Sequence, residues 1–399
     1  MQTSLWNNKD YIRLLGAQVL SLLGTGISSV ALALLAWELA KEQASLVLSI
    51  AFALKMVAYI VLAPLFGAFA TRLNRKRVLV ALDIFRALLF VCMPFVSQLW
   101  QVYLLMFLVN ACSAGFTPIY QSTLPDMLPQ REHYTKALSF SRMAYDLEQV
   151  LSPLLAALLL TLMSYNTLFY LDALSFVVSA LLILSCRSAL IAGNGKKQQG
   201  EVQVKWLHGV QSYLGNLNLR SLWFAYLAAS AASAMVIVNT VVYVHQILKG
   251  GDSQTAIAMA LVGSGSLFIA IKLPGWLKKR SAEFYICYGL ALICLAMFAG
   301  STTPNWPGFV LICLTLGAGM SLIQTPAGLI ISESKTGAQI NELFAAHFSL
   351  THFWWFFTYL GAGLSASYFG LSGAYLVMGM VSVIAVLLLL FTNRLVRQS

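Results

Sequence analysis

Residues 14–39 read LLGAQVLSLLGTGISSVALALLAWEL, an apolar run whose one ionisable residue, Glu38, stands almost at its end. A helix of that length crosses a hydrocarbon core about 30 Å thick. The ten residues before Tyr11 are polar, and no small-residue cleavage site followed by a polar mature domain comes after the run. We therefore interpret the run as a first transmembrane helix rather than as a cleaved signal peptide.

The composition of the whole chain agrees with a membrane solvent. Of the 399 residues, 59% are hydrophobic and only 10% are charged, whereas soluble domains carry about 25% charged residues. The mean hydropathy is +0.78. The six cysteines lie in or at the ends of apolar runs and form no Cys-x-x-Cys pair. The composition thus excludes a soluble domain, a disulfide framework and a cysteine zinc site.

Apolar runs of spanning length continue along the chain. Because lipid cannot satisfy backbone hydrogen bonds, continuous runs of this kind predict helices and an all-α membrane protein. We expect twelve transmembrane helices, near residues 13–39, 46–70, 78–99, 101–123, 138–163, 165–186, 221–247, 254–276, 282–302, 306–331, 341–368 and 371–392.

The distribution of basic residues predicts the orientation of these helices. With the N-terminus inside, 20 of the 25 Lys and Arg residues fall on the inner side, and only Lys41 and Lys249 fall outside. The remaining three, Lys55, Arg86 and Lys272, lie within or at the edges of spans. Basic residues concentrate in cytoplasmic loops, so we expect an inner-membrane protein with both termini in the cytoplasm. The net charge of +11 is then a topology signal, and no nucleic-acid partner is expected.

The two halves of the chain repeat at one offset of 208 residues, which indicates duplication. We expect a six-helix bundle over residues 1–186, a cytoplasmic linker over 187–220 and a second, pseudo-symmetric bundle over 221–399. Such repeats imply alternating access around a site near the middle of the membrane. The matching positions are Gly67 with Gly275, Arg72 with Arg280, Thr117-Pro118 with Thr325-Pro326, Ala137 with Ala345, and Phe140-Ser141 with Phe348-Ser349.

Three segments resemble a known family. Residues 67–77, GAFATRLNRKR, are similar to the loop signature between spans 2 and 3 of the major facilitator superfamily. Residues 83–89, DIFRALL, and 172–180, DALSFVVSA, resemble the macrolide-efflux-like branch of its twelve-span drug–proton antiporters. The resemblance implies the major facilitator fold, secondary transport, and a cavity between spans 1, 2, 4 and 5 and spans 7, 8, 10 and 11.

Two positions depart from that family pattern. The usual Asp of the loop signature is Thr71 here, and the Gly-Pro of span 5 is Ser152-Pro153. By position and resemblance, a further group of residues is interpreted as a gating or scaffold set. Its members are Gly67, Arg72, Arg75, Asp83, Arg86, Arg142 and Asp172.

Span 5 and span 11 hold the candidate proton carriers, because an ionisable group inside a membrane is costly and usually functional. Arg142 and Asp146 are four residues apart and would form a structural pair. Glu148 lies about 200° round the helix from Asp146 and would be the proton carrier, or else a residue at the cytoplasmic end whose side chain reaches the membrane surface or a loop cation. We therefore assign proton coupling to Glu148, Asp146 and His347; the histidine is included because its side chain titrates near neutral pH.

The substrate cavity is predicted from polar and aromatic residues within the spans. Lys55 would suit an anionic substrate, or would form a gate or structural pair with Glu38. The aromatic run at residues 353–359 would hold an organic cation or flat ring system, or else would face lipid or pack between helices. The expected cavity residues are Lys55, Glu38, Asn110, Asn239, Gln324, Thr351, Trp354, Trp355 and Thr358.

Several chemistries have no motif in the sequence. A phosphate-binding loop, His-Glu-x-x-His, Gly-x-Ser-x-Gly and clustered Cys and His ligands are all absent. We therefore expect neither an ATP-driven pump nor an enzyme, with no cofactor and no resident metal. The leading hypothesis is a proton-coupled exporter of small organic molecules, drug-like or siderophore-like, acting as a monomer in the lipid bilayer.

The sequence leaves other functions open. Glu342, His347 and His352 would be ligands in an exporter of divalent nickel- or cobalt-like ions, although the two histidines point to different helix faces. Import of a siderophore and flipping of a lipid are further alternatives. A non-transporting receptor or assembly factor on the same scaffold is the alternative from a different class, and substrate-dependent proton movement would exclude it.

Overall fold

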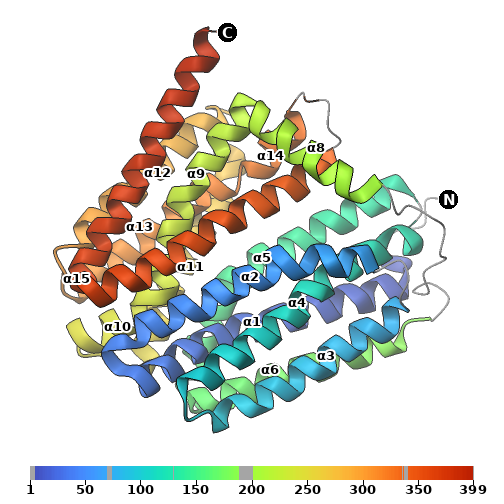
Figure 1. Cartoon of the computed structure of the whole chain (residues 1–399), viewed down its shortest axis with the longest axis horizontal. Helices are drawn as coiled ribbons and strands as arrows, with labels where there is room; N and C mark the ends of the chain where they lie inside the picture. Colours follow the sequence, from blue (N-terminus) through green and yellow to red (C-terminus); the bar gives the residue numbers. More distant parts are fainter. Residues whose placement is uncertain are drawn as a thin grey trace. The chain divides into compact units, whose positions relative to one another are not determined.

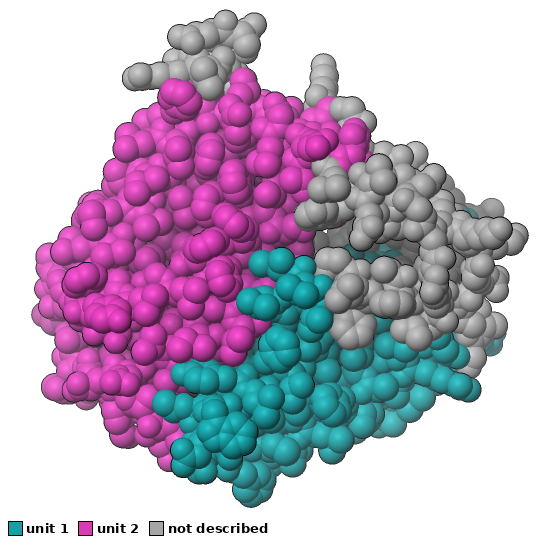
Figure 2. Space-filling model, viewed as in Figure 1, with its two compact units in different colours: residues 1–35, 57–197 teal, residues 36–56, 198–399 magenta. Residues whose placement is uncertain are grey.

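The structure, a computed structural model, describes residues 5–69, 74–128, 130–187, 201–334, 336 and 340–398, without the side chains of some of these. The described chain is almost entirely helical and contains no strand (Figure 1). It divides into two compact units: unit 1 comprises residues 1–35 and 57–197, and unit 2 comprises residues 36–56 and 198–399 (Figure 2).

Unit 1 is built from long apolar helices. Within it, α3 contacts both α4 and α6, and α4 contacts α5. The first two helices contribute residues to both units, since α1 enters unit 2 at Ala36 and α2 returns to unit 1 at Val57. The bounds are α1 Lys9–Ala40, α2 Ala44–Phe69, α3 Arg75–Cys92, α4 Leu99–Met127, α5 Arg131–Leu159 and α6 Tyr165–Ser185.

Unit 2 is organised around α9 and the long α15, which lie side by side. Helix α13 contacts α11, α12 and α9, and α8 lies along α15. The bounds are α8 Glu201–Gly215, α9 Leu217–Ala234, α10 Thr240–Val242, α11 Asp252–Trp276, α12 Ala282–Gly300, α13 Trp306–Gln324, α14 Ala327–Glu333 and α15 Ile340–Gln398. Two π-helical turns, Met235–Asn239 and Tyr243–Ile247, flank α10.

Helix ends occur where the sequence favours a break. Gly370 interrupts α15 with φ 69° and ψ −179°, a conformation open to glycine because it has no Cβ. Pro326 separates α13 from α14, since proline cannot donate a backbone hydrogen bond to the turn before it. Lys41, with φ 48°, lies in the short 3₁₀ turn between α1 and α2.

The predicted all-α fold is confirmed, and the described residues of each of the twelve predicted spans are largely helical. Nine described segments are long and apolar enough to cross a membrane, and two of these, Lys9–Leu62 and Glu342–Thr392, each include two predicted spans. Helix α5 is not among the nine, which reflects its charged first half. The expected bundle boundaries, 1–186 and 221–399, stay a prediction. The expected linker contains α8, a helix that the sequence analysis did not predict.

Candidate functional site

A buried carboxyl group lies where α6 meets α1. Asp172 is fully buried, and Ser175 Oγ donates a hydrogen bond to its Oδ1 at 3.1 Å. A Cβ on Gly24 of α1 would collide with both Asp172 and Ser175, so glycine is what lets α6 approach this closely. Among the described residues, Asp172 Oδ2 and the nearby Ser28 Oγ both lack a well-formed hydrogen bond.

A second buried carboxylate, Asp83 of α3, is fully paired. One oxygen forms an ion pair with Arg86 of the same helix, and the other accepts a hydrogen bond of 2.7 Å from Ser179 of α6. The Arg86 guanidinium lies 4.7 Å from the ring centre of Phe116 and 4.3 Å from that of Phe176. Aromatic faces stabilise a desolvated cation, which offsets part of the cost of burying Arg86, although its Nε has no hydrogen-bond partner among the described residues.

The third carboxyl group of this region, Glu148, lies on α5 and is half-buried. A Cβ on Gly26 of α1 would stand 2.6 Å from Glu148 Oε1 and would collide with Ser152. Eight residues before Gly26 on α1, Gln18 Nε2 donates a buried hydrogen bond of 2.7 Å to Ser141 Oγ. This bond joins α1 to α5. The glycines, serines and Gln18 were not predicted as site residues, and only their small size or polarity within apolar runs could have revealed them.

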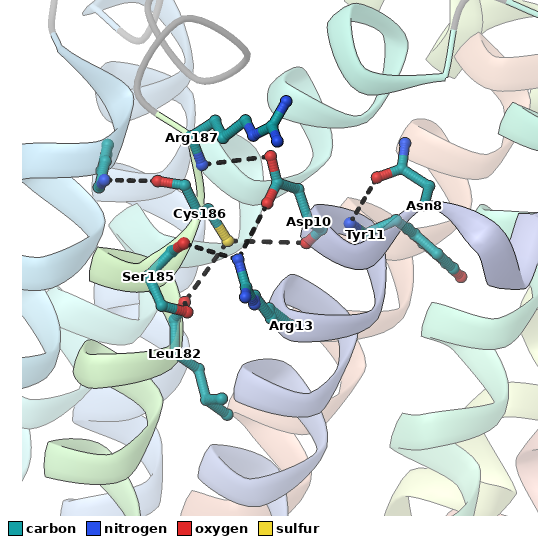
Figure 3. A network of polar contacts seen from close by, with 9 residues as sticks. Asn8, Asp10, Tyr11, Arg13, Leu182, Ser185, Cys186 and Arg187 are labelled. Carbon is teal, nitrogen blue, oxygen red and sulfur yellow. Dashed lines mark hydrogen bonds and ion pairs between the residues drawn. The ribbon is translucent and has the colours of Figure 1, made fainter.

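At one end of unit 1, polar contacts join the start of α1 to the end of α6 (Figure 3). Arg13 donates a hydrogen bond of 2.7 Å to the Ser185 carbonyl, and Lys76 of α3 donates one of 2.6 Å to the Cys186 carbonyl. Asp10 accepts the Arg187 backbone N–H at 3.1 Å. Cations at the C-terminal end of a helix complement its dipole. Burial raises the pKa of the Cys186 thiol to about 11, so this cysteine stays protonated.

In unit 2, His347 of α15 contacts helix α8. Its Nδ1 shares a hydrogen bond of 2.8 Å with Tyr213 Oη of α8, and its ring meets the edge of Tyr226 at 4.6 Å. One helical turn earlier, Glu342 lies 3.1 Å from His208 Nδ1. The predicted proton carrier His347 therefore contacts α8, which lies outside the apolar spans.

The tryptophans of α15 differ in their roles. Trp354 Nε1 donates to the Trp223 carbonyl at 2.9 Å, and Trp223 Nε1 donates to the Leu350 carbonyl at 2.9 Å. The two indoles stack with ring centres 4.7 Å apart. Trp355, by contrast, has a buried Nε1 without a hydrogen-bond partner among the described residues. Trp354 therefore joins α15 to α9, whereas the Trp355 indole N–H is available to another acceptor.

Two of the predicted cavity residues, Lys55 and Glu38, lie on the first two helices. Lys55 Nζ lies 5.8 Å from the ring centre of Phe52, which stacks on Tyr359 of α15 at 5.3 Å. Glu38 is exposed, and the ion pairs among the described side chains do not include one between it and Lys55. Lys55 thus lies beside an aromatic pair within unit 2.

Most of the predicted neutral cavity residues are satisfied by backbone. Asn110, Thr351 and Thr358 each donate to a carbonyl one turn earlier in their own helix, at 2.7, 2.8 and 3.0 Å. Asn239 Nδ2 reaches the Ala362 carbonyl at 3.4 Å, while its Oδ1 is buried without a partner in the described chain. Gln324 is half-buried at the last residue of α13.

Part of the predicted scaffold set is not described. Arg72 lies outside the described residues, as do the side chains of Arg142 and Asp146. Gly67 lies in α2, and Arg75 is buried at the start of α3. No group of three metal-ligating side chains occurs in the described part of the chain.

A hollow of about 680 Å³ lies beside α3, and the residues that line it do not include the buried carboxyls. Its wall includes Phe85 and Leu88, whose side chains are exposed. On a membrane-spanning helix such a surface faces lipid, so we do not assign the transport site there.

Comparisons with known proteins agree with this architecture. The sequence model of the Major Facilitator Superfamily matches residues 14–358. The uncharacterized MFS-type transporter YfiS of Bacillus subtilis is 26% identical over 98% of this chain and 94% of its own length. Macrolide efflux protein A of Streptococcus pyogenes is 27% identical over 46% of this chain and 45% of its own length.

Solved structures share the fold at low sequence identity. The nucleoside transporter NupG matches with a TM-score of 0.74 at 11% identity, over 96% of this chain and 99% of its own. A bacterial homolog of the human lysosomal transporter Spinster matches with a TM-score of 0.74 at 12% identity, over 98% of both chains. The helices, their apolar spans and the family match together identify the chain as a multi-pass membrane transporter that belongs to the Major Facilitator Superfamily.

Proposed function

We propose that this transporter exports drug-like or siderophore-like small organic molecules in exchange for protons. The observation that carries the proposal is the presence of two carboxyl groups, Glu148 and Asp172, against α1 among the apolar helices of unit 1. Carboxyl groups in such surroundings are costly and usually functional, and proton transfer is a function that they can perform.

The cargo class is inferred from unit 2 and from one relative. Thr351 and Thr358 use their hydroxyls within α15, which leaves few hydrogen-bonding groups for a sugar-like solute. A buried acceptor on Asn239 and a buried donor on Trp355 remain without described partners. A mostly apolar molecule with a few polar groups fits such a lining, and one relative is by name a macrolide efflux protein.

Proton flux in reconstituted vesicles loaded with a pH dye tests this function. The vesicles would be challenged in turn with erythromycin, tetraphenylphosphonium, a catecholate siderophore and Ni²⁺. We expect flux that depends on one organic class, is lost in Glu148→Gln and His347→Ala, and persists in Glu283→Gln, an exposed Glu-to-Gln control. Flux with Ni²⁺ alone would instead favour a metal exporter, and the absence of flux with every compound would overturn the proposal.

The proposed setting is the inner membrane, with both termini and the linker in the cytoplasm and the monomer as the working unit. The excess of basic residues on one side supports this orientation. A fluorescent protein fused after Ser399 should fold and fluoresce, and alkaline phosphatase at the same place should be inactive. The reverse pattern would overturn the orientation.

A further inference from the structure

The buried charges that the structure describes around the contact of α3 with α6 do not balance. Around the contact of α3 with α6, the described side chains provide two fully buried carboxyls, Asp83 and Asp172, and one buried cation, Arg86. Glu148 on α5 contacts the same stretch of α1, since it lies against Gly26 and Asp172 lies against Gly24. On α1, the facing residues Gly24 and Ser28 carry no charge. With both aspartates ionised, the two aspartates and Arg86 alone would leave one uncompensated negative charge inside the membrane, which is costly even before the half-buried Glu148 is counted.

The contacts decide which aspartate is neutral. Both oxygens of Asp83 are used, one by the Arg86 guanidinium and one by the Ser179 hydroxyl. Asp172 has one hydrogen bond, from Ser175, and its Oδ2 is buried without a partner among the described residues. A charged oxygen in that position would be uncompensated, whereas a protonated Oδ2 needs only an acceptor, and Ser28 Oγ lies nearby.

We propose that Asp172 carries a proton at neutral pH and is the resting proton site of the transporter. The inference rests on the proposed function and names the group that holds the exchanged proton. In the exchange step, the Oδ2–H bond of Asp172 breaks and the Glu148 carboxylate forms the new O–H bond. Asp172 is left ionised, where it competes with Asp83 for Arg86. Loss of the proton would thereby alter the contact that joins α3 to α6.

Infrared spectroscopy of the full-length protein in lipid nanodiscs tests the proton site without any substrate. We expect the C=O band of a protonated carboxylic acid at pH 7, displaced when aspartate is labelled with ¹³C at its side-chain carboxyl. The displaced band should vanish in Asp172→Asn and remain in Glu148→Gln. In Asp172→Glu the band should return but no longer respond to the aspartate label, which gives a second variant should Asp172→Asn fail to fold.

Two results would overturn the assignment. One is a wild-type spectrum without a label-sensitive band, which would mean that Asp172 is ionised. The other is a label-sensitive band that persists in both Asp172 variants, which would place the proton on another aspartate.

A transport assay distinguishes a failure of this inference from a failure of the proposed function. In vesicles with a pH gradient, the gradient-driven accumulation of erythromycin should be at least tenfold lower in Asp172→Asn than in wild type. The rate at which the variant exchanges labelled for unlabelled erythromycin should stay within twofold of the wild-type rate. Asp252→Asn, at the exposed start of α11, is the matched control and should behave as wild type. Wild type without driven accumulation of any organic compound of the earlier panel would overturn the proposed function, and the infrared result would still decide the proton site. Full driven transport by Asp172→Asn would overturn the inference alone.

Discussion

Ser179 of α6 donates a hydrogen bond of 2.7 Å to the carboxylate of Asp83 on α3, from a position 96 residues further along the chain. The same carboxylate holds Arg86, so one buried group joins two helices and neutralises a cation. Removing one partner of a buried ion pair is costly because the other charge is left uncompensated.

Arg86→Met should therefore lower the free energy of unfolding by about 3–5 kcal/mol, because Asp83 would lose its cation. Arg77→Met is the control, since Arg77 is exposed on the same helix and its replacement should cost less than about 0.5 kcal/mol. Tryptophan fluorescence during thermal unfolding in detergent would measure both. Equal stability of the two variants would contradict an energetic role for the buried pair.

Asp83→Asn should change the charge state of Asp172. Without the Asp83 carboxylate, the Arg86 guanidinium becomes available to Asp172, and an ionised Asp172 then balances the cluster. The label-sensitive carboxylic acid band should consequently weaken in Asp83→Asn. Ser179→Ala removes only one hydrogen bond to Asp83 and should leave the band intact. An undiminished band in Asp83→Asn would show that the two aspartates do not compete for Arg86.

The glycines of α1 should tolerate alanine unequally. A Cβ at Gly24 or Gly26 would collide with side chains of α6 or α5, and such overpacking costs about 1–3 kcal/mol. A Cβ at Gly16 would meet only Leu182, at an ordinary 3.8 Å. Gly16→Ala should therefore be neutral or gain about 0.5–1 kcal/mol through its helix propensity, whereas Gly24→Ala and Gly26→Ala should lower the unfolding temperature. Similar unfolding temperatures for all three would contradict the close approach.

The stacked indoles of unit 2 predict a graded loss of stability when Trp354 is replaced. Trp354→Phe keeps an aromatic ring against Trp223 but loses the hydrogen bond to its carbonyl, at a cost of about 1 kcal/mol. Trp354→Ala also loses the packing and should cost about 3–5 kcal/mol. Phe353→Leu changes the exposed neighbouring ring and should stay within about 0.5 kcal/mol of wild type. Unfolding in detergent orders the three variants, and a different order would contradict the assigned role.

The helices could be predicted from the sequence because each span is decided locally, by a continuous apolar run. Helix α8 was missed for the same reason, since its polar sequence resembles a linker and its helical form is supported by contacts with α15. The interruption at Gly370 fell between two predicted spans, where the structure continues as helix on either side of one residue.

The site could be predicted only in part. Asp83 and Arg86 are three residues apart on one helix, so their pairing follows from helix geometry. That Ser179 would take the second oxygen of Asp83, and that Asp172 would be left without a cation, depend on how α3, α6 and α1 pack. Periodicity within one helix carries no information about such contacts. The sequence analysis accordingly placed Asp172 with the scaffold residues.

The hydrogen bond between Tyr213 and His347 predicts a dependence of stability on alkaline pH. Burial raises the pKa of the Tyr213 phenol well above its usual range. An unfolded chain releases this proton above pH about 10, while the folded chain retains it. The contribution of the protonated Tyr213 to the free energy of unfolding is therefore complete below pH about 10. It declines as the pH rises toward the pKa of Tyr213 in the folded chain, by up to about 1.4 kcal/mol per pH unit.

Thermal unfolding between pH 8 and 12 measures this decline. Tyr213→Phe should be less stable than wild type by about 1 kcal/mol at pH 8, because the bond to His347 is lost, and should decline less steeply above pH 10. Tyr368→Phe, at a side chain that is 78% exposed, should follow the wild-type curve. Parallel curves for wild type and Tyr213→Phe would mean that Tyr213 ionises alike in the folded and unfolded chain, and that α8 does not bury it in solution.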